Sequence, residues 1–261
     1  MAPIFLPDLR LNARVDGPET GRPLVLIHAL GLRLDIWDGL VARLPRHRIL
    51  RFDLRGHGAS DIPPPPYAMG ALIRDAERLM EHFAMTEAVV LGLSIGGLIA
   101  QGLAVKRPDL LRGLVLSNTA ARIGLAAQWQ DRIALVRAGG LAAIAEPTLE
   151  RWLGRGWREN PVMPILRDMF LAGSAEGWIG CAAAIAGTDF YETAALLRLP
   201  TLALAGTNDG STPPDLVRET AELIPGAQFR LIRGAGHIPV LEQPADYADA
   251  VQAFLARIGH G

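Results

Sequence analysis

The sequence predicts an α/β fold: a mostly parallel, twisted β-sheet flanked by helices, with an all-helical segment inserted between two of its strands. The first observation behind this prediction is a series of short apolar runs bounded by Gly, Pro or charged residues, a pattern typical of strands buried on both faces. These runs cover residues 24–28, 49–53, 88–93, 114–117, 201–205 and 229–232.

Helical patterns are the second observation, and they lie where the crossovers between parallel strands are expected. Apolar residues recur at helical spacing over residues 71–83, 95–106 and 246–258. Pro244 stands near the first turn of the last of these helices, a position that proline favours. The apolar stripe that should hold this helix against the sheet consists of Tyr247, Val251, Phe254 and Ile258.

The third observation is that the alternation stops from about residue 119 to residue 193. Alanine-rich helical segments without a strand pattern hold four tryptophans there: Trp129, Trp152, Trp157 and Trp178. Sheet-like segments resume after Leu199 and no linker-like composition separates the parts, so an insertion fits better than a second domain. We therefore assign residues 1–118 and 196–261 to a sheet-containing core and residues 119–195 to a helical cap.

Composition and charge exclude several classes of function. The chain has 261 residues and a formal net charge of -1, which supplies no positive field for nucleic acid. Its apolar runs fall far short of the roughly 18 residues that span a bilayer, and no secretory signal pattern stands at the beginning. Cys181 is the single cysteine and cannot form an internal disulfide. We expect a cytoplasmic protein that binds neither nucleic acid nor membranes, and the sequence leaves its oligomeric state open.

A G-x-S-x-G motif, Gly92-Leu93-Ser94-Ile95-Gly96, joins the run at residues 88–93 to the helical pattern at 95–106. A sharp strand-to-helix turn puts its central residue at positive φ and needs glycine two positions to either side, so that the backbones can pass. Such a turn lifts the serine hydroxyl into the open, which makes Ser94 the candidate nucleophile. The alternative is a glycine-rich turn that carries an ordinary serine.

A serine nucleophile needs a histidine base that an acid orients, here in the chain order Ser, Asp, His. Asp209 follows the run at residues 201–205, and His237 follows the run at 229–232. Both would lie on loops at the C-terminal ends of parallel strands, where open α/β sheets build their sites. The other five histidines are expected to be solvated (His47, His82 and His260) or to fix the loops that carry them (His28 and His57).

Two backbone N–H groups are expected to hold the negative charge that develops on the substrate oxygen. One belongs to Leu30, on the loop that His28 opens, and the other to Ile95, at the start of the nucleophile helix. No metal or organic cofactor is predicted, because the chain has no G-x-x-x-x-G-K-[ST], G-x-G-x-x-G or H-E-x-x-H motif.

Along nearly its whole length the chain resembles the α/β-hydrolase superfamily, through the motifs above and the D-L-R-G-H-G-A-S segment at residues 53–60. Within that superfamily it is similar to 3-oxoadipate enol-lactonases of the β-ketoadipate pathway of aromatic catabolism. The similarity is carried by residues 30–38 and 117–124, Trp129, Arg132, Arg151-Trp152 and residues 172–177. Two positions depart from the family, which commonly has Asn-Ser at His28-Ala29 and Met at Ile95. Both oxyanion donors are backbone N–H groups, so a change of side chain at these positions should leave the oxyanion hole intact. The departures therefore bear on substrate preference.

The resemblance implies that Ser94 opens a carboxylated five-membered enol-lactone in an apolar, aromatic pocket with one cation aimed at the free carboxylate. A planar guanidinium suits a carboxylate, and three cap arginines are candidates: Arg122, Arg132 and Arg151. We favour Arg122, which opens the most family-like segment, and we expect Trp129 and Trp152 to line the pocket. The alternatives are that the arginines lie on solvated helix faces and that the tryptophans only hold the cap to the sheet.

Two other functions stay open at this point. The same triad would serve a general carboxylesterase or a cofactor-free perhydrolase, against which the arginine-rich cap argues. A non-catalytic receptor with this fold would bind a small ligand under the cap. Such receptors lose or misplace a triad residue, whereas all three are present here.

Overall fold

Among the residues that the structure describes, 2–6 and 8–261, eight strands form one sheet. In this computed structural model the strands are β1 (Ala2–Leu6), β2 (Leu9–Asp16), β3 (Arg22–Ile27), β4 (His47–Phe52), β5 (Ala88–Leu93), β6 (Leu111–Ser117), β7 (Thr201–Gly206) and β8 (Gln228–Ile232). Their order across the sheet is β1-β2-β4-β3-β5-β6-β7-β8. Strands β3 to β8 run parallel to one another, whereas β2 is antiparallel to both β1 and β4. The predicted mostly parallel sheet is confirmed.

The two antiparallel strands at the N-terminus were not predicted. In β2 the side chains of Leu9, Leu11 and Ala13 are buried, while Arg10 between them is exposed. Such alternation is typical of an outer antiparallel strand with one solvated face. Because its apolar residues alternate with polar ones, β2 contains no continuous apolar run of the kind that marks strands buried on both faces.

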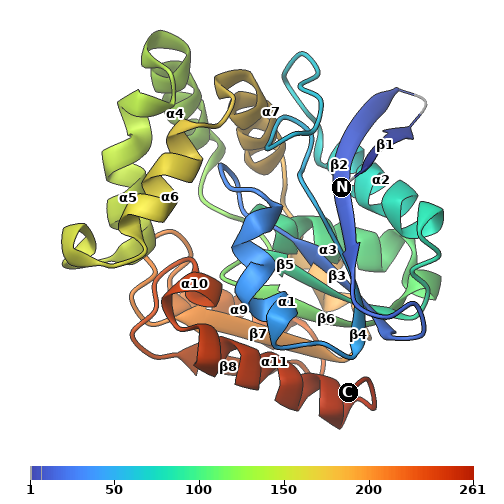
Figure 1. Ribbon diagram of the computed structural model, residues 1–261. Helices are drawn as coiled ribbons and strands as arrows, with labels where there is room; N and C mark the ends of the chain where they lie inside the picture. The colour runs from blue at the N-terminus through green and yellow to red at the C-terminus, as the bar shows by residue number, and fades with distance from the viewer. Residues whose placement is uncertain (1, 7) are drawn as a thin grey trace.

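Helices cover both faces of the sheet (Figure 1). Helices α1 (Asp38–Ala42), α10 (Pro239–Glu242) and α11 (Pro244–Arg257) pack together on one face, and α2 (Met69–His82), α3 (Ile95–Lys106) and α9 (Pro214–Leu223) lie on the other. The short 3₁₀ helices η1 (Leu34–Trp37) and η2 (Pro108–Leu110) lie in connections of this core. Three of these helices, α2, α3 and α11, agree with the predicted segments. The stripe on α11 buries Tyr247, Val251 and Phe254 as expected.

The segment between β6 and β7 is helical throughout its regular structure within the described chain. Its helices are α4 (Ala126–Gly139), η3 (Leu141–Ile144), α5 (Ala145–Leu153), η4 (Trp157–Glu159), α6 (Met163–Leu171), α7 (Ala175–Ala186) and α8 (Tyr191–Ala195). Helix α4 packs on α7 and α5 packs on α6, above one edge of the sheet (Figure 1). Helix α8 packs against α3 and α9 instead, so it lies beside the sheet. The boundaries of the cap at residues 119 and 195 stay a prediction.

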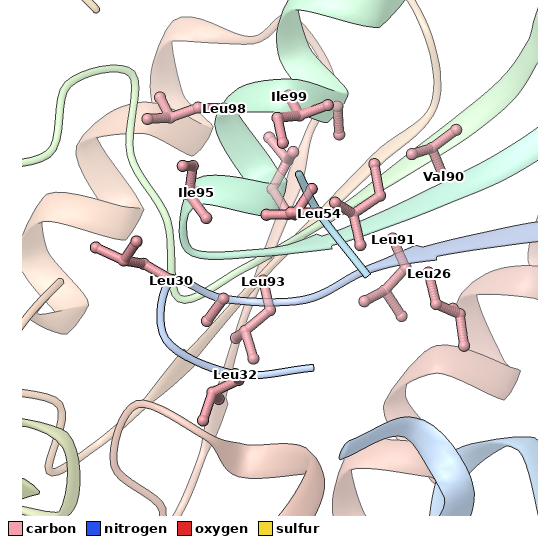
Figure 2. Close-up of a cluster of buried hydrophobic side chains, with 14 of the residues drawn as sticks. Leu26, Leu30, Leu32, Leu54, Val90, Leu91, Leu93, Ile95, Leu98 and Ile99 are labelled. Carbon is pink, nitrogen blue, oxygen red and sulfur yellow. The ribbon is translucent and has the colours of Figure 1, made fainter. Parts of the chain in front are cut away.

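One continuous hydrophobic core joins the sheet to the cap. Figure 2 shows its centre, where side chains of β3 and β5 meet those of α3: Leu26, Val90, Leu91, Leu93, Ile95, Leu98 and Ile99. The same cluster extends to Trp129, Trp152 and Trp178 of the cap. Burying each large apolar side chain stabilises the fold by roughly 1.5 to 3 kcal/mol. The cap tryptophans therefore hold the cap to the sheet, whatever else they do.

Strand β8 departs from the expectation that all the apolar runs are buried on both faces. It is the last strand of the sheet, and Arg230 and Leu231 are exposed while Ile232 is buried. An edge strand lacks a neighbour on one side, so its short apolar run is only partly covered.

Two histidines that were expected to be solvated, His47 and His260, are buried, so this expectation is wrong. The chain turns back after α11, and the His47 Nε2–H group donates to the carbonyl oxygen of His260 at 2.9 Å. The Nε2–H group of His260 donates in turn to the carbonyl oxygen of Pro23 at 2.9 Å. The charged neighbour Arg46 is exposed, but its exposure says nothing about the histidine beside it at the start of β4.

In the described part of the chain, no single helix is long and apolar enough to cross a membrane. Helices α6 and α7 reach that length and apolarity only together, as a pair bent by 101°.

Candidate active site

Ser94 lies between β5 and α3 in a strained backbone conformation, with φ +58° and ψ -117°. A Cβ atom on Gly92 would lie 2.1 Å from the carbonyl oxygen of Gly96, and one on Gly96 would lie 2.3 Å from that of Ile27. Both positions therefore require glycine, as the motif predicted. The turn is also held by Thr119, whose hydroxyl donates to the carbonyl oxygen of Ser94 at 2.7 Å.

The predicted acid and base meet at the C-terminal edge of the sheet. His237 Nδ1 lies 2.8 Å from Asp209 Oδ2, and both side chains are buried. Because the carboxylate accepts from Nδ1–H, the Nε2 atom of His237 is left to accept a proton. The arrangement suits a histidine that acts as a general base.

Asp209 is surrounded by hydrogen-bond donors. Its Oδ2 atom accepts from Asn118 Nδ2 at 2.9 Å and from the Thr212 hydroxyl at 2.8 Å. Its Oδ1 atom accepts from the backbone N–H groups of Ser211 and Thr212, at 2.7 and 3.1 Å. Burial opposes ionisation, but the attraction of His237 and the hydrogen bonds from His237, Asn118 and Thr212 hold the pKa of Asp209 below its ordinary value. The carboxylate stays charged and faces the imidazole.

Asn118 is a site residue to which the sequence analysis gave no role. Its Nδ2 group donates both to Asp209 and to the carbonyl oxygen of Gly236, at 2.9 and 3.0 Å, and so joins the acid loop to the histidine loop. Its backbone is at φ +45°, a conformation that asparagine tolerates better than most residues. An asparagine directly after a buried strand was the available signal. Strained backbone of this kind concentrates at functional sites.

Helix α5 of the cap is attached to the loops that carry Asp209 and His237 through carbonyl groups of its last turn. The carbonyl oxygen of Trp152 accepts from the N–H group of His237 at 2.6 Å, and that of Arg151 accepts from Gly210 at 2.8 Å. Carbonyl groups in the last turn of a helix lack intrahelical partners, so the loops complete the end of α5. The indole of Trp152 also stacks on the imidazole of His237, with 6.1 Å between centroids and 21° between planes.

A cavity of about 50 Å³ opens beside Ser94 and His237. Its lining brings together five of the predicted binding residues and oxyanion donors: Leu30, Trp129, Arg132, Arg151 and Trp152. Four further residues line the cavity and were not predicted to do so: Ile123, Thr148, Trp178 and Ser211. The cavity is apolar and aromatic on several sides and carries two guanidinium groups.

The two arginines at this cavity have no carboxylate partner within the described chain. Arg132 lies over the ring of Trp129, 4.8 Å from its centroid, and Arg151 donates to the Thr148 hydroxyl at 3.2 Å. Burial lowers the pKa of both groups, that of Arg151 to about 10, where repulsion by Arg132 adds to the effect. Two neighbouring cations that are partly removed from water favour an anion between them.

Arg122, the cation that we favoured, does not line the cavity. Its guanidinium pairs with Asp189 at 3.1 Å and lies over the ring of Tyr191, and the side chain is about half exposed. The chain turns at Asn118 after β6, which buries Ala120 and Ala121 and directs Arg122 toward α8. Closeness in sequence to the strand end was therefore a poor guide to where this side chain points.

The loop that carries Leu30 is fixed by two buried histidines. His57 Nε2 accepts from the N–H group of Gly31 at 2.9 Å, and His28 Nε2 accepts from the N–H group of Leu54 at 3.0 Å. A Cβ on Gly96 would also meet the carbonyl oxygen of His28 at 3.1 Å, which brings this loop against the start of α3. Both histidines fix loops, as expected. The predicted oxyanion donors, the N–H groups of Leu30 and Ile95, thus belong to two adjoining segments.

We expect the free energy of unfolding to fall by about 2 kcal/mol between pH 7 and pH 5 because of His57 alone. Burial, with repulsion by His28, lowers the pKa of His57 to about 3, against an ordinary value of 6.5. Between these values the unfolded chain binds the extra proton, so acid favours unfolding. Urea unfolding at pH 7 and pH 5 measures the difference, which should shrink in His57→Gln and persist in the control His82→Gln on an exposed histidine. An unchanged difference in His57→Gln would contradict the prediction.

In the described residues, no group of three or more His, Cys, Asp or Glu side chains is arranged to hold a metal ion. The groups that gather at the site are the hydroxyl of Ser94, the imidazole of His237 with the carboxylate of Asp209, and two guanidiniums.

The parallel sheet, the strained serine turn and the acid and histidine loops together define an α/β-hydrolase. The family described as alpha/beta hydrolase fold matches residues 22–244, and the chain belongs to it. The chain is 33% identical to 3-oxoadipate enol-lactonase 2 of Acinetobacter baylyi, over 96% of its own length and 94% of the relative's. These comparisons confirm the predicted fold class and the predicted resemblance.

Two solved structures are similar over almost the entire chain. The enol-lactonase from Burkholderia xenovorans is 33% identical with a TM-score of 0.93, over 98% of this chain and 100% of that one. A thermophilic esterase from Thermogutta terrifontis, described as malate bound, is 30% identical with a TM-score of 0.92, over 99% of both chains. The relatives thus include both lactonases and esterases.

Proposed function

We propose that this protein is a serine hydrolase that opens the ring of 3-oxoadipate enol-lactone to give 3-oxoadipate through an acyl-enzyme. The observation that carries the proposal is the pair of guanidiniums, Arg132 and Arg151, at the cavity that Ser94 and His237 share, without a carboxylate partner in the described chain. Relatives named as enol-lactonases support it. The proposal puts the protein in aromatic catabolism, in the cytoplasm, with a small carboxylated lactone as its partner.

In the proposed reaction His237 Nε2 takes the proton of the Ser94 hydroxyl as its oxygen attacks the lactone carbonyl. Asp209 holds the imidazole through Nδ1 and stabilises its charged form. The N–H groups of Leu30 and Ile95 hold the oxyanion. His237 then gives the proton to the departing enol oxygen. No metal or organic cofactor takes part in these steps.

The ring opens without losing a fragment, because the enol oxygen stays tethered to the acyl group through the ring carbons. The acyl-enzyme therefore carries the freed enol, which tautomerises to the ketone. Water, activated by His237, then cleaves the ester to Ser94 and releases the second carboxylate. The product bears two negative charges, which the two arginines of the cavity can face.

Removing either cavity arginine should impair turnover of the charged lactone selectively. A charge-assisted hydrogen bond is worth roughly 1.5 to 3 kcal/mol, so Arg151→Ala and Arg132→Ala should each lower kcat/KM about 10- to 150-fold. The neutral ester p-nitrophenyl acetate has no anion to anchor and should lose much less. Arg122→Ala is the matched control, because Arg122 lies outside the cavity in the ion pair with Asp189. Steady-state kinetics on both substrates make the comparison.

Equal losses on both substrates in Arg132→Ala and Arg151→Ala, or none on either, would contradict a carboxylate anchor. In that case a general carboxylesterase, or a perhydrolase with the same triad, becomes the better interpretation. A wild-type chain that hydrolyses neither substrate would favour a non-catalytic receptor.

A further inference from the structure

Glu242, the last residue of α10, binds the backbone on both sides of His237. Its Oε2 atom accepts from the N–H group of Gly236 at 2.9 Å, and its Oε1 atom accepts from the N–H group of Ile238 at 3.0 Å. Asn160, in the cap, lies with Nδ2 at 3.4 Å from the same Oε2 atom. The carboxylate of Glu242 thus binds the N–H groups on both sides of His237 and also lies close to the cap residue Asn160.

The N–H group of His237 itself donates to Trp152 at 2.6 Å. Three consecutive N–H groups, of residues 236 to 238, are therefore all held, two of them by the single side chain of Glu242. The carbonyl oxygen of Gly236 is held as well, by Asn118. Hydrogen bonds to Glu242, Trp152 and Asn118 thus fix the backbone that carries the imidazole.

A carboxylate is suited to hold the two N–H groups on either side of His237. An ionised carboxylate has two equivalent acceptor oxygens, whereas an amide has one acceptor and presents donors on its other side. Burial raises the pKa of Glu242, although the N–H groups of Gly236 and Ile238 and the attraction of His237 counteract this effect. Among the described residues no cationic side chain pairs with this partly buried carboxylate, which is costly to keep charged, and the two amides beside His237 account for its presence.

We propose that Glu242 is a positioning residue for His237, which holds the two flanking amides so that the imidazole lies between Asp209 and Ser94. The proposal rests on the proposed function, in which His237 is the general base. Glu242 touches neither substrate nor reacting atoms in this scheme, and it acts only through the backbone of the histidine loop.

Glu242→Gln should lower kcat about ten- to a hundredfold while KM changes less than about twofold. A displacement of a catalytic group by about 1 Å is enough for a loss of this size, because the reaction depends on close alignment. The amide of the variant would turn a donor toward one of the two N–H groups and push that part of the loop away. Glu222→Gln makes the same chemical change on the exposed face of α9 and is the matched control.

The second readout is the NMR signal of the His237 Nδ1 proton, which lies in the hydrogen bond to Asp209. In Glu242→Gln this signal should shift or broaden, and in Glu222→Gln it should match the wild type. A variant that loses stability without moving the imidazole would leave this signal in place. If Glu242→Gln does not fold, Glu242→Asp takes its place in both measurements, since aspartate keeps the charge but is too short to reach both amides.

Wild-type kcat in the folded variant would overturn the proposal, and so would a lower kcat with an unchanged Nδ1 proton signal. His237→Ala separates this failure from failure of the proposed function. If His237→Ala is inactive while Glu242→Gln matches the wild type, the triad stands and only the role of Glu242 falls. If His237→Ala is active, the general base lies elsewhere, and both proposals fall.

Discussion

Replacing Ser94 by alanine should lower kcat by about four to six decades and leave the fold intact. In the proposed reaction this hydroxyl supplies the covalent step, and Ser94 lines the same cavity as His237. Alanine keeps the Cβ atom, so the backbone strain at φ +58° is the same in both proteins. Steady-state rates on the enol-lactone and on p-nitrophenyl acetate measure the loss, and circular dichroism during heating checks the fold.

Ser211→Ala is the matched control, because the Ser211 side chain lines the same cavity. Its kcat should fall only slightly, as expected for a pocket residue that takes no part in the covalent step. A phosphonate that labels serine nucleophiles should mark Ser94 in the wild type and in Ser211→Ala, as peptide mass spectrometry can show. More than about a hundredth of wild-type activity in Ser94→Ala would mean that another nucleophile is at work.

Replacing Asp209 by asparagine should lower kcat on the order of ten thousand-fold. The carboxylate accepts from His237, Asn118, Thr212 and two backbone N–H groups, and an amide nitrogen cannot accept from any of them. The amide would either favour the wrong tautomer of His237 or leave buried donors without partners. Each such donor costs roughly 1 to 3 kcal/mol, so the free energy of unfolding should fall as well.

The controls for Asp209→Asn are Asp189→Asn and Asp215→Asn. Asp189 pairs with Arg122, and Asp215 lies in the first turn of α9, so both should leave kcat close to the wild-type value. Kinetics on both substrates and urea unfolding of all three variants show which aspartate orients His237. Near wild-type turnover in Asp209→Asn, with a large loss in one of the other two, would mean that a different acid orients the histidine.

The nucleophile turn could be predicted from sequence because its glycines and its serine stand together in one short motif between a strand and a helix. The requirement at Gly92 comes from Gly96 and Gly97 in the same turn, whereas a Cβ on Gly96 would meet Ile27 of β3. The bounds of β5 and α3 agree with those predicted. Asp209 and His237 could be found because each follows a strand of the same parallel sheet, whose C-terminal ends share one edge.

The contacts that complete the site could not be predicted in the same way. Asn118 reaches Asp209 across 91 positions of sequence, and this meeting depends on the strand order rather than on any local pattern. Glu242 lies only five positions after His237, but nothing in its neighbours tells a carboxylate that binds backbone amides from a solvated one. Arg122 was misjudged for a related reason: a position near a strand end does not give the direction of a long side chain.

The attachment of α5 to the loops of Asp209 and His237 has a consequence for how the cap can move when a substrate binds. A cavity of about 50 Å³ has room for only a few water molecules, so the lactone requires more space than the cavity has in this structure. If the whole cap lifted as a rigid body, the hydrogen bonds from His237 to Trp152 and from Gly210 to Arg151 would break, and the loops that carry Asp209 and His237 would lose their contact with α5. The end of α5 must therefore stay with the loops of Gly210 and His237 if these hydrogen bonds are to persist while a substrate binds.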